Sequence, residues 1–247
     1  MAAYVKLLQL QRDLYNLPRG PERFQHYLDT LVKDDDLALP LAAMNPMAKE
    51  HIPARLDELI VLGADSIAAD ATAEATQRLN TTNDYRVTLV LVDDVAGGWT
   101  DRQSIEIRQY TAQPDAELKR GWRSVLLWAT DPPTPDAIRS AVLTTLCRTE
   151  HLAQHPTPTT LREYLSWVGT ERAFATPEPA SVDTAELEYT RVVLESQLES
   201  TDFPTIFTSL YGDTHARRLG YPPLGLSDYA GCILAHHDAL SSTHAGK

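Results

Sequence analysis

Residues 85–92, with the sequence YRVTLVLV, decide the fold prediction because they are rich in Val, Leu and Thr. A short run of this composition is typical of a buried strand. Residues 122–128, WRSVLLW, have a similar pattern, so we predict a second buried strand there. Helical patterns precede and follow this pair. The arrangement predicts a predominantly helical α+β fold rather than alternating βαβ units. We expect a small central β-sheet of two to four strands, at about residues 85–130, packed by N- and C-terminal helices.

The segment between the two strands carries signals for both kinds of secondary structure. Ile105 and Ile107 alternate with other residues as in a strand, whereas Thr100 or Asp101 can cap a helix. We favour a strand for residues 102–110. The acidic and glycine-rich residues 93–98 then form a turn after the first strand.

The N-terminal third shows helical periodicity. Apolar side chains recur with the spacing of one helix face at Phe24, Tyr27, Leu28, Leu31 and Val32. Asn45 followed by Pro46 predicts the start of another helix, which Gly63 closes. We expect Asp65 to cap an alanine-rich helix after that.

Helix signals also dominate the chain after the second strand. Residues 134–136, Thr-Pro-Asp, predict a helix start, and Thr159 or Thr160 is expected to cap the next helix. Residues 170–182 contain two prolines and little apolar material, which indicates a linker or long surface loop. We therefore predict a main α+β domain at residues 1–169 and a helical segment at 183–247 that packs on it.

Composition narrows the function classes. The chain has 247 residues, with 22 Lys and Arg against 34 Asp and Glu, and a formal net charge of -12. A negative surface repels phosphate backbones, so no nucleic acid partner is expected. Cys147 and Cys232 stand far apart without a CxxC motif, which argues against a zinc ribbon or a disulfide framework. No apolar run reaches the ~18 residues of a membrane span, and the N-terminus lacks a signal-peptide pattern. We expect a cytoplasmic protein.

Glu150, His151 and His155 form the pattern with the clearest chemical implication. Residues four apart project from the same face of a helix, so the two imidazoles can reach one ion. Two histidines and a carboxylate are the ligands of many helical zinc sites, where bound water becomes a nucleophile. This pattern predicts a divalent metal, zinc, on His151 and His155, with Glu150 as a ligand or as the catalytic base. His51 and Glu50 are the nominal candidates for a further ligand from elsewhere in the chain.

The same pattern has a structural alternative. In the His-Glu-x-x-His motif the base directly follows the first histidine, but Leu152 takes that place here. Histidines at a helix C-terminus also interact with the helix dipole, and His155 can cap free carbonyls ahead of Pro156. The spacing therefore allows a capping role as well as a metal site.

A second candidate site follows the first strand. Its residues are Asp93, Asp94, Gly97, Gly98, Trp99 and Arg102. Carboxylates and glycines at the end of a buried strand often line ligand crevices, where the aspartates can hold Mg²⁺ and the arginine an anion. The alternative is a turn, in which the glycines supply positive φ and Trp99 covers the core.

A third segment of interest, residues 219–227, contains Tyr221-Pro222-Pro223. It can be a rigid connector or a surface for a partner, and we favour the connector because Leu224 and Leu226 return to the core.

Two function classes remain open. The first is a metal-assisted hydrolase built on His151 and His155, with residues 93–102 as a substrate wall. The second is a non-catalytic helical protein that engages another protein or a second copy of itself. The second class is supported by the helical stripes and by the incomplete catalytic motifs.

Overall fold

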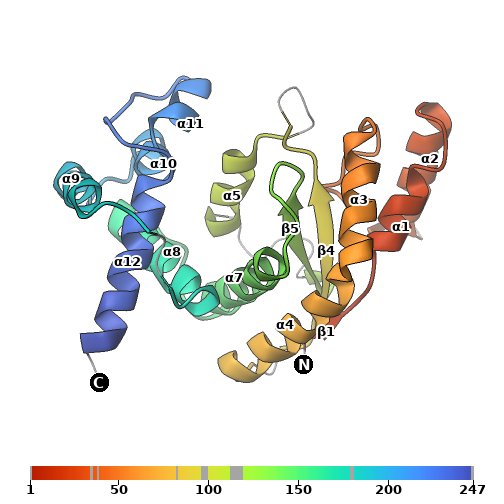
Figure 1. Ribbon diagram of the computed structural model, residues 1–247, viewed down its shortest axis with the longest axis horizontal. Coiled ribbons are helices and arrows are strands. Elements are labelled where there is room, and N and C mark those ends of the chain that lie inside the picture. The colour runs from red at the N-terminus through yellow and green to blue at the C-terminus, as the bar shows by residue number, and fades with distance from the viewer. Residues whose placement is uncertain are drawn as a thin grey trace. The chain divides into compact units, whose positions relative to one another are not determined.

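The computed structural model describes residues 2–33, 36–37, 39–81, 83–95, 100–111, 119–178 and 181–245. These residues are mainly helical and include a small sheet, which confirms the predicted α+β class (Figure 1). The chain forms two compact units. The first contains residues 1–102 and 114–150, and the second contains residues 103–113 and 151–247. The linker predicted at 170–182 is wrong for residues 170–175, because the preceding helix continues to Ala175, and the segment belongs to the second unit.

A three-stranded parallel sheet forms the centre of the first unit, with the strand order β1-β4-β5. Strand β4 (Arg86–Val92) pairs with β5 (Trp122–Trp128) along its whole length, and the short β1 (Ala3–Tyr4) pairs with the beginning of β4. Every residue of β4 after Arg86 is buried. Parallel strands are covered on both faces, which explains why this strand is a continuous apolar run rather than an alternating one. Both predicted strands are confirmed.

Helices α1 and α4 pack on this sheet, and α3 packs against both of these helices. Leu8, Leu56 and Ala68, one from each of these helices, are fully buried. The other elements of the unit are α1 (Leu8–Leu14), α2 (Pro21–Leu31), β2 (Val32–Lys33), β3 (Asp36–Leu37), α3 (His51–Leu62), α4 (Ala64–Leu79) and residues 135–150 of α7 (Pro135–Gln154).

The start of α3 differs from the prediction. The helix begins at His51 and not at Pro46; the Asn45 side chain accepts a hydrogen bond from the Met47 backbone N–H in a local turn, and its amide donates to Asp93. Gly63 closes α3 as predicted, with a left-handed φ of 74°, and it directly precedes α4. Asp65 does not cap α4; its carboxylate accepts a hydrogen bond from the Tyr4 hydroxyl at 2.6 Å.

The strand predicted at residues 102–110 is wrong, because these residues form helix α5 (Arg102–Thr111). Gln103, Ile107 and Tyr110 are buried, and their spacing of four and three residues defines one helix face. The alternation of Ile105 and Ile107 was misleading, since only Ile107 is buried. Strands β4 and β5 are parallel, so the chain between them forms a crossover connection instead of a tight turn. Helix α5 is part of this connection in the sequence.

The second unit is a set of helices around its own apolar core. Its elements are α5 from Gln103 onward, the end of α7, α8 (Leu161–Ala175), α9 (Thr184–Glu195), α10 (Phe203–Tyr211), α11 (Asp213–Arg218) and α12 (Ala230–Ala245). Thr160 caps α8 in a capping box with Glu163, as the sequence predicts. Helices α8 and α12 approach closely at Gly169, where a Cβ atom would lie 2.4 Å from the Ala235 carbonyl oxygen.

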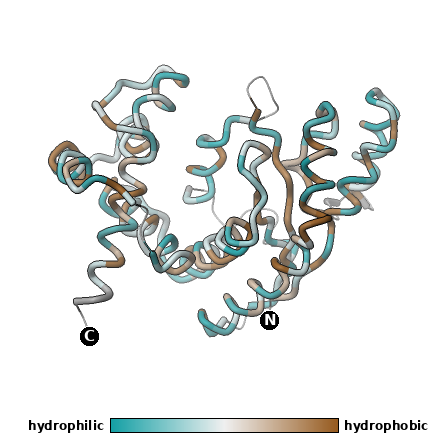
Figure 2. The backbone as a smooth tube through the Cα atoms, viewed as in Figure 1, coloured by the Kyte–Doolittle hydropathy of each residue, from teal (hydrophilic) through white to brown (hydrophobic). Residues whose placement is uncertain are grey.

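Hydropathy along the backbone follows these two cores. In Figure 2, β4 is a continuous hydrophobic segment, whereas the helices alternate between hydrophobic and hydrophilic residues. Such alternation belongs to helices with one buried face. No helix in the described ranges has the length and apolar character needed to cross a bilayer.

Candidate functional site

The carboxyl ends of β4 and β5 bring together several polar side chains of the first unit. Asp93 and Asp94 directly follow β4, while Thr130 and Asp131 come just after β5. The two strands are parallel and in register, so both pairs leave the sheet at the same edge. Open α/β sheets usually bind their ligands outside this edge. This edge of the sheet is therefore a candidate ligand site.

Asp93 is the centre of this group, and only 2% of its surface is exposed. Its Oδ1 atom lies 2.9 Å from Nε2 of His51, in the first turn of α3. Its Oδ2 atom accepts a hydrogen bond of 2.8 Å from the Asn45 side-chain amide. A buried carboxylate needs such partners, because an unpaired charge is very costly away from water.

This arrangement fixes the tautomer of His51. An ionised carboxylate can only accept hydrogen bonds, so the contact with Asp93 places the imidazole proton on Nε2. The lone pair of the neutral ring is then on Nδ1, which has no partner among the residues that the structure describes. The His51 side chain is 37% exposed, whereas that of Asp93 is 3% exposed. A buried acid thus orients a histidine whose side chain is partly exposed to solvent.

Asn45 is itself held in place from two directions. Its side-chain oxygen accepts a hydrogen bond from the Met47 backbone N–H at 3.0 Å, and its backbone carbonyl oxygen accepts one from the Tyr15 hydroxyl at 2.6 Å. Burial raises the pKa of Tyr15 well above its ordinary value, so this hydroxyl remains a donor. The amide that binds Asp93 is therefore in a rigid position.

Asp94 and Arg102 join the ends of the two strands. The Asp94 carboxylate accepts hydrogen bonds from the Thr130 backbone N–H at 3.0 Å and from its hydroxyl at 2.6 Å. Arg102 forms an ion pair with Asp131 at 2.7 Å, lies 4.0 Å from Asp94 and stacks 5.2 Å from the ring centre of Trp128. These contacts brace the edge of the sheet.

Of the residues predicted for a ligand site, Asp94 and Arg102 lie 4.0 Å apart, while the Asp93 carboxylate contacts Asn45 and His51. The remaining predicted members, Gly97, Gly98 and Trp99, lie outside the described residues. The oxygens of the two aspartates bind protein donors. The predicted roles in holding Mg²⁺ and gripping an anion stay predictions.

Glu150 does not lie with this group. It is 5% exposed and accepts hydrogen bonds at 2.9 Å from the Tyr85 hydroxyl and from the Asn83 side-chain amide. Burial raises the pKa of Tyr85 well above its ordinary value, and the nearby Glu150 charge raises it further. These bonds tie α7 to the beginning of β4.

His151 and His155 make contacts within the second unit. Their rings stack with centroids 4.1 Å apart and an angle of 22° between the ring planes. His155 Nδ1 lies 3.1 Å from the His151 carbonyl oxygen. The His151 ring also packs edge-on against Trp167 at 4.2 Å. Burial lowers the pKa of His151, and the neighbouring His155 lowers it further.

This geometry matches the capping alternative. Stacked rings present their faces to each other, whereas metal ligands direct their nitrogen lone pairs at one point. No group of three His, Cys, Asp or Glu side chains placed to hold a metal ion occurs in the described ranges. A metal on His151 and His155 stays a prediction.

The segment at residues 219–227 is held as a connector. The Asp213 carboxylate accepts hydrogen bonds from the backbone N–H groups of Leu224, Gly225 and Leu226 at 2.8, 3.1 and 3.2 Å. Sequence analysis did not single out Asp213, although the acidic residue follows a glycine at the start of a short helix.

Asn45 and Thr130 were also missed as site residues. Asn45 was assigned to a helix cap, and its place 48 residues before Asp93 gives no sign of a contact between the two. The usable signal was the position of Asp93 at the end of a buried strand.

Comparisons with protein-family models, curated proteins and solved structures find no match to the chain.

Proposed function

We propose that this protein is a hydrolase of carboxylic or phosphoric esters, in which His51 is the general base and Asp93 orients it. The contact between the buried Asp93 carboxylate and Nε2 of His51 carries the proposal, because it leaves Nδ1 as the accessible base. The position of this pair beyond the carboxyl end of β4 supports a role in binding and turnover.

The chemistry follows from the tautomer. Nδ1 accepts a proton from water while the water oxygen bonds to the electrophilic carbon or phosphorus of the ester. The same nitrogen returns the proton to the leaving-group oxygen as the old bond breaks. Asp93 stabilises the intermediate imidazolium through its contact with Nε2, as the acid of a catalytic triad does. Positioned general bases contribute roughly 10²–10⁴-fold to a rate.

The proposal keeps the hydrolase class expected from the sequence and assigns the base to another residue. Glu150, the earlier candidate, has both carboxylate oxygens bound to Tyr85 and Asn83. His51, by contrast, combines a fixed orientation with exposure. The formal charge of -12 favours small substrates over nucleic acids, and the two isolated cysteines support a cytoplasmic location.

The test is turnover of a chromogenic panel of p-nitrophenyl acyl esters and p-nitrophenyl phosphate. We expect hydrolysis by the wild type and a loss of roughly 10²-fold or more in kcat/KM in His51→Gln. Asp93→Asn should also lose activity, because an amide in that place no longer fixes the tautomer. His26→Gln, at an exposed position on α2, is the matched control and should retain full activity.

Two results would overturn the proposal. One is the absence of turnover across the whole panel. The other is hydrolysis that survives in His51→Gln while circular dichroism shows the variant to be folded.

A further inference from the structure

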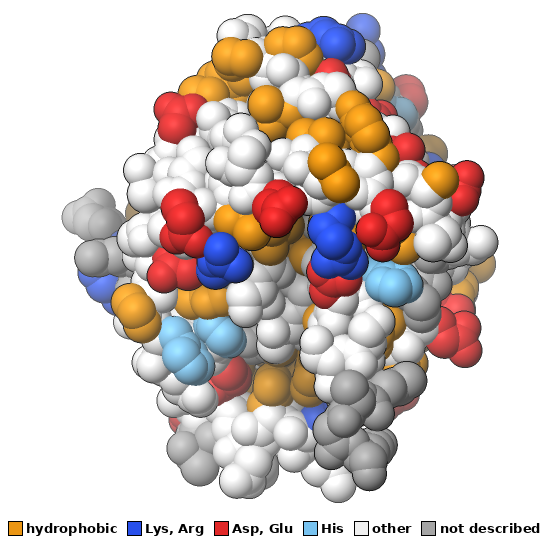
Figure 3. Space-filling view, turned by 90° about the vertical axis from the view of Figure 1, so that its left-hand side faces the viewer, with side chains coloured by type: hydrophobic (Ala, Val, Ile, Leu, Met, Phe, Trp, Pro, Cys, Tyr) orange, Lys and Arg blue, Asp and Glu red, His pale blue; other side chains and the backbone are white. Residues whose placement is uncertain are grey.

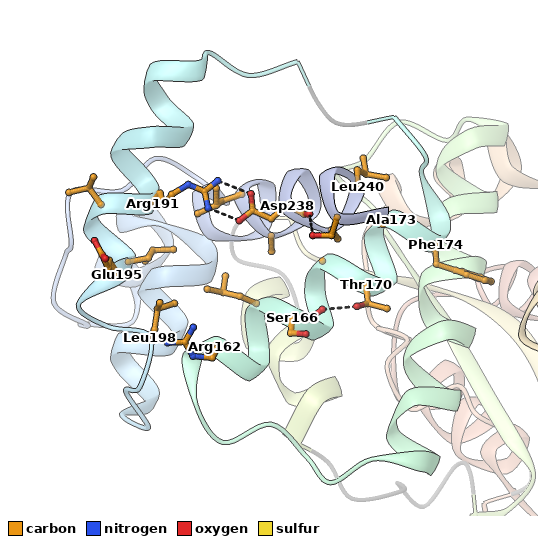
Figure 4. Close-up of a pocket in the computed structure, with 18 of the residues that line it drawn as sticks. Arg162, Ser166, Thr170, Ala173, Phe174, Arg191, Glu195, Leu198, Asp238 and Leu240 are labelled. Atoms are coloured by element: carbon orange, nitrogen blue, oxygen red, sulfur yellow. Dashed lines mark hydrogen bonds and ion pairs between the residues drawn. The ribbon is translucent and has the colours of Figure 1, made fainter. Parts of the chain in front are cut away.

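The second unit contains a groove between helices α8, α9 and α12, with a volume of about 1030 Å³ (Figure 4). Pockets of this size bind small organic ligands. Its apolar lining includes Leu165, Leu194, Leu198 and Leu234. Figure 3 shows hydrophobic side chains inside a hollow of this face, with acidic and basic side chains beside it.

Hydrogen bonds and an ion pair connect the segments that form the groove at two points. Near the start of α8, the backbone N–H groups of Leu161 and Arg162 donate to the carbonyl oxygens of Ser200 and Leu198 at 3.0 and 2.9 Å. At a separate point, a two-pronged ion pair with distances of 2.8 and 2.7 Å ties α9 to α12 through Arg191 and Asp238. These attachments hold α9 in place beside the groove.

Small residues form part of the wall opposite α9. Gly169 of α8 allows the close approach to α12, and Ala173, Ala235 and Ala239 also line the space. Short side chains at these positions leave room that leucines would fill. The groove is therefore a consequence of the sequence of α8 and α12 together with the fastened α9.

Polar groups gather at one end of the groove, near the start of α8. Arg162 and Ser166 lie one turn apart on α8 and both line the groove, where Figure 4 shows them together. Arg162 is paired with Glu199 at 2.6 Å, and the two side chains are 59% and 74% exposed. Such surface pairs contribute little and exchange readily. The Ser166 hydroxyl has no partner among the described side and main chains.

The other charged groups of the lining do not compete for this position. Arg191 is held by Asp238, and the Asp238 contact raises the pKa of its guanidinium. Glu195 belongs to α9, and in Figure 4 its carboxylate does not point toward Arg162. An anion is thus complementary to the end formed by Arg162 and Ser166.

We propose that this groove binds a single-chain amphiphile with an anionic head group, of the fatty-acid type. The head group accepts hydrogen bonds from the Arg162 guanidinium and the Ser166 hydroxyl. The alkyl chain lies against Leu165, Leu194 and Leu234. The Arg191–Asp238 pair lines the groove, and an alkyl chain is thinner than a docked helix, which is about 10 Å wide, so we take the chain as the occupant that leaves this pair intact.

Binding is measured on the full chain by calorimetry with dodecanoate, and with dodecanol as a ligand of equal chain length without charge. We expect saturable one-to-one binding of dodecanoate. Arg162→Gln should weaken dodecanoate binding roughly tenfold, corresponding to the loss of one charged contact, and should leave dodecanol binding unchanged. Ser166→Trp, at an exposed position, should block both ligands. Arg218→Gln, an exposed arginine outside the groove, is the control.

The proposal is overturned if dodecanoate shows no saturable binding, or if Arg162→Gln and Arg218→Gln bind it equally well. Dissociation of a dimer by Ser166→Trp, seen by light scattering without dodecanoate binding to the wild type, would instead assign the groove to a second copy. His51→Gln should bind dodecanoate normally, so this test is separate from the hydrolase proposal.

Discussion

The amide of Asn45 offers a quantitative test of the site, through the substitution Asn45→Ala. The side chain makes two hydrogen bonds, one to the Asp93 carboxylate at 2.8 Å and one from the Met47 backbone N–H at 3.0 Å. The bond from Tyr15 reaches the backbone of Asn45 and survives the substitution. The variant therefore removes one charged and one neutral bond in a region that is 7% exposed.

The expected magnitude is the sum of these two losses. A hydrogen bond to a charged group contributes about 1.5–3 kcal/mol and a neutral one about 0.5–1.5 kcal/mol. We expect Asn45→Ala to lower the free energy of unfolding of the first unit by about 2–4.5 kcal/mol. Leaving the buried Asp93 oxygen without a donor adds to the cost.

Asn83→Ala is a matched comparison for this variant. Asn83 also donates its amide to a carboxylate, that of Glu150 at 2.9 Å, but its own side chain is exposed. We expect a smaller loss than in Asn45→Ala, because only one hydrogen bond is removed and water reaches the place of the exposed amide. The two variants compare a buried amide donor with an exposed one, each bound to a buried carboxylate.

Native-state hydrogen exchange of the β4 amides reports on the first unit, and urea unfolding gives the global stability. Equal losses in Asn45→Ala and Asn83→Ala would refute the burial of the Asp93 contact. A loss below about 1 kcal/mol in Asn45→Ala would do the same.

Three further predictions concern the second unit. Burial lowers the pKa of both His151 and His236, so each binds a proton less readily in the folded than in the unfolded chain; urea unfolding should show stability present above about pH 6.5 and lost as pH falls below it. Gly169→Ala should cost about 1–3 kcal/mol, measured by thermal unfolding, because its Cβ would overlap a backbone carbonyl of α12. Asp213→Ala should cost at least about 3 kcal/mol in urea unfolding, since the carboxylate accepts hydrogen bonds from the backbone of residues 224–226.

Each of these has a simple control. The double variant His151→Gln, His236→Gln should flatten the pH dependence, and an unchanged slope would contradict the assignment. Gly20→Ala should be tolerated, because nothing lies within 4 Å of the added atom. Asp202→Ala removes a helix cap of α10 and should cost only about 1 kcal/mol. A loss in Asp213→Ala no larger than in Asp202→Ala would show that the connector does not depend on Asp213.

The two strands were predictable because burial on both faces demands a continuous apolar run, and residues 85–92 have one. Their parallel direction was not predictable, because it depended on the segment between them. In α5 the buried face is defined by Gln103, Ile107 and Tyr110, and a polar residue in that stripe concealed the helical period.

The candidate site was predictable in part for a similar reason. Asp93 marks the end of a buried strand, a position where ligands often bind. Its partners Asn45 and His51 lie 48 and 42 residues earlier in the chain, and only the fold of the first unit brings them to it. The spacing of His151 and His155 was correct for one helix face, but the orientation of His151 depends on Trp167, which spacing does not reveal.

The position of the proton on His51 tests the central claim most directly. Long-range ¹H–¹⁵N correlation spectra, assigned with His51→Gln, distinguish a protonated from an unprotonated ring nitrogen. For the neutral ring we expect the proton on Nε2 and an unprotonated Nδ1, and a mixture of tautomers in Asp93→Asn. A proton on Nδ1 in the wild type, or spectra that Asp93→Asn leaves unchanged, would contradict the account.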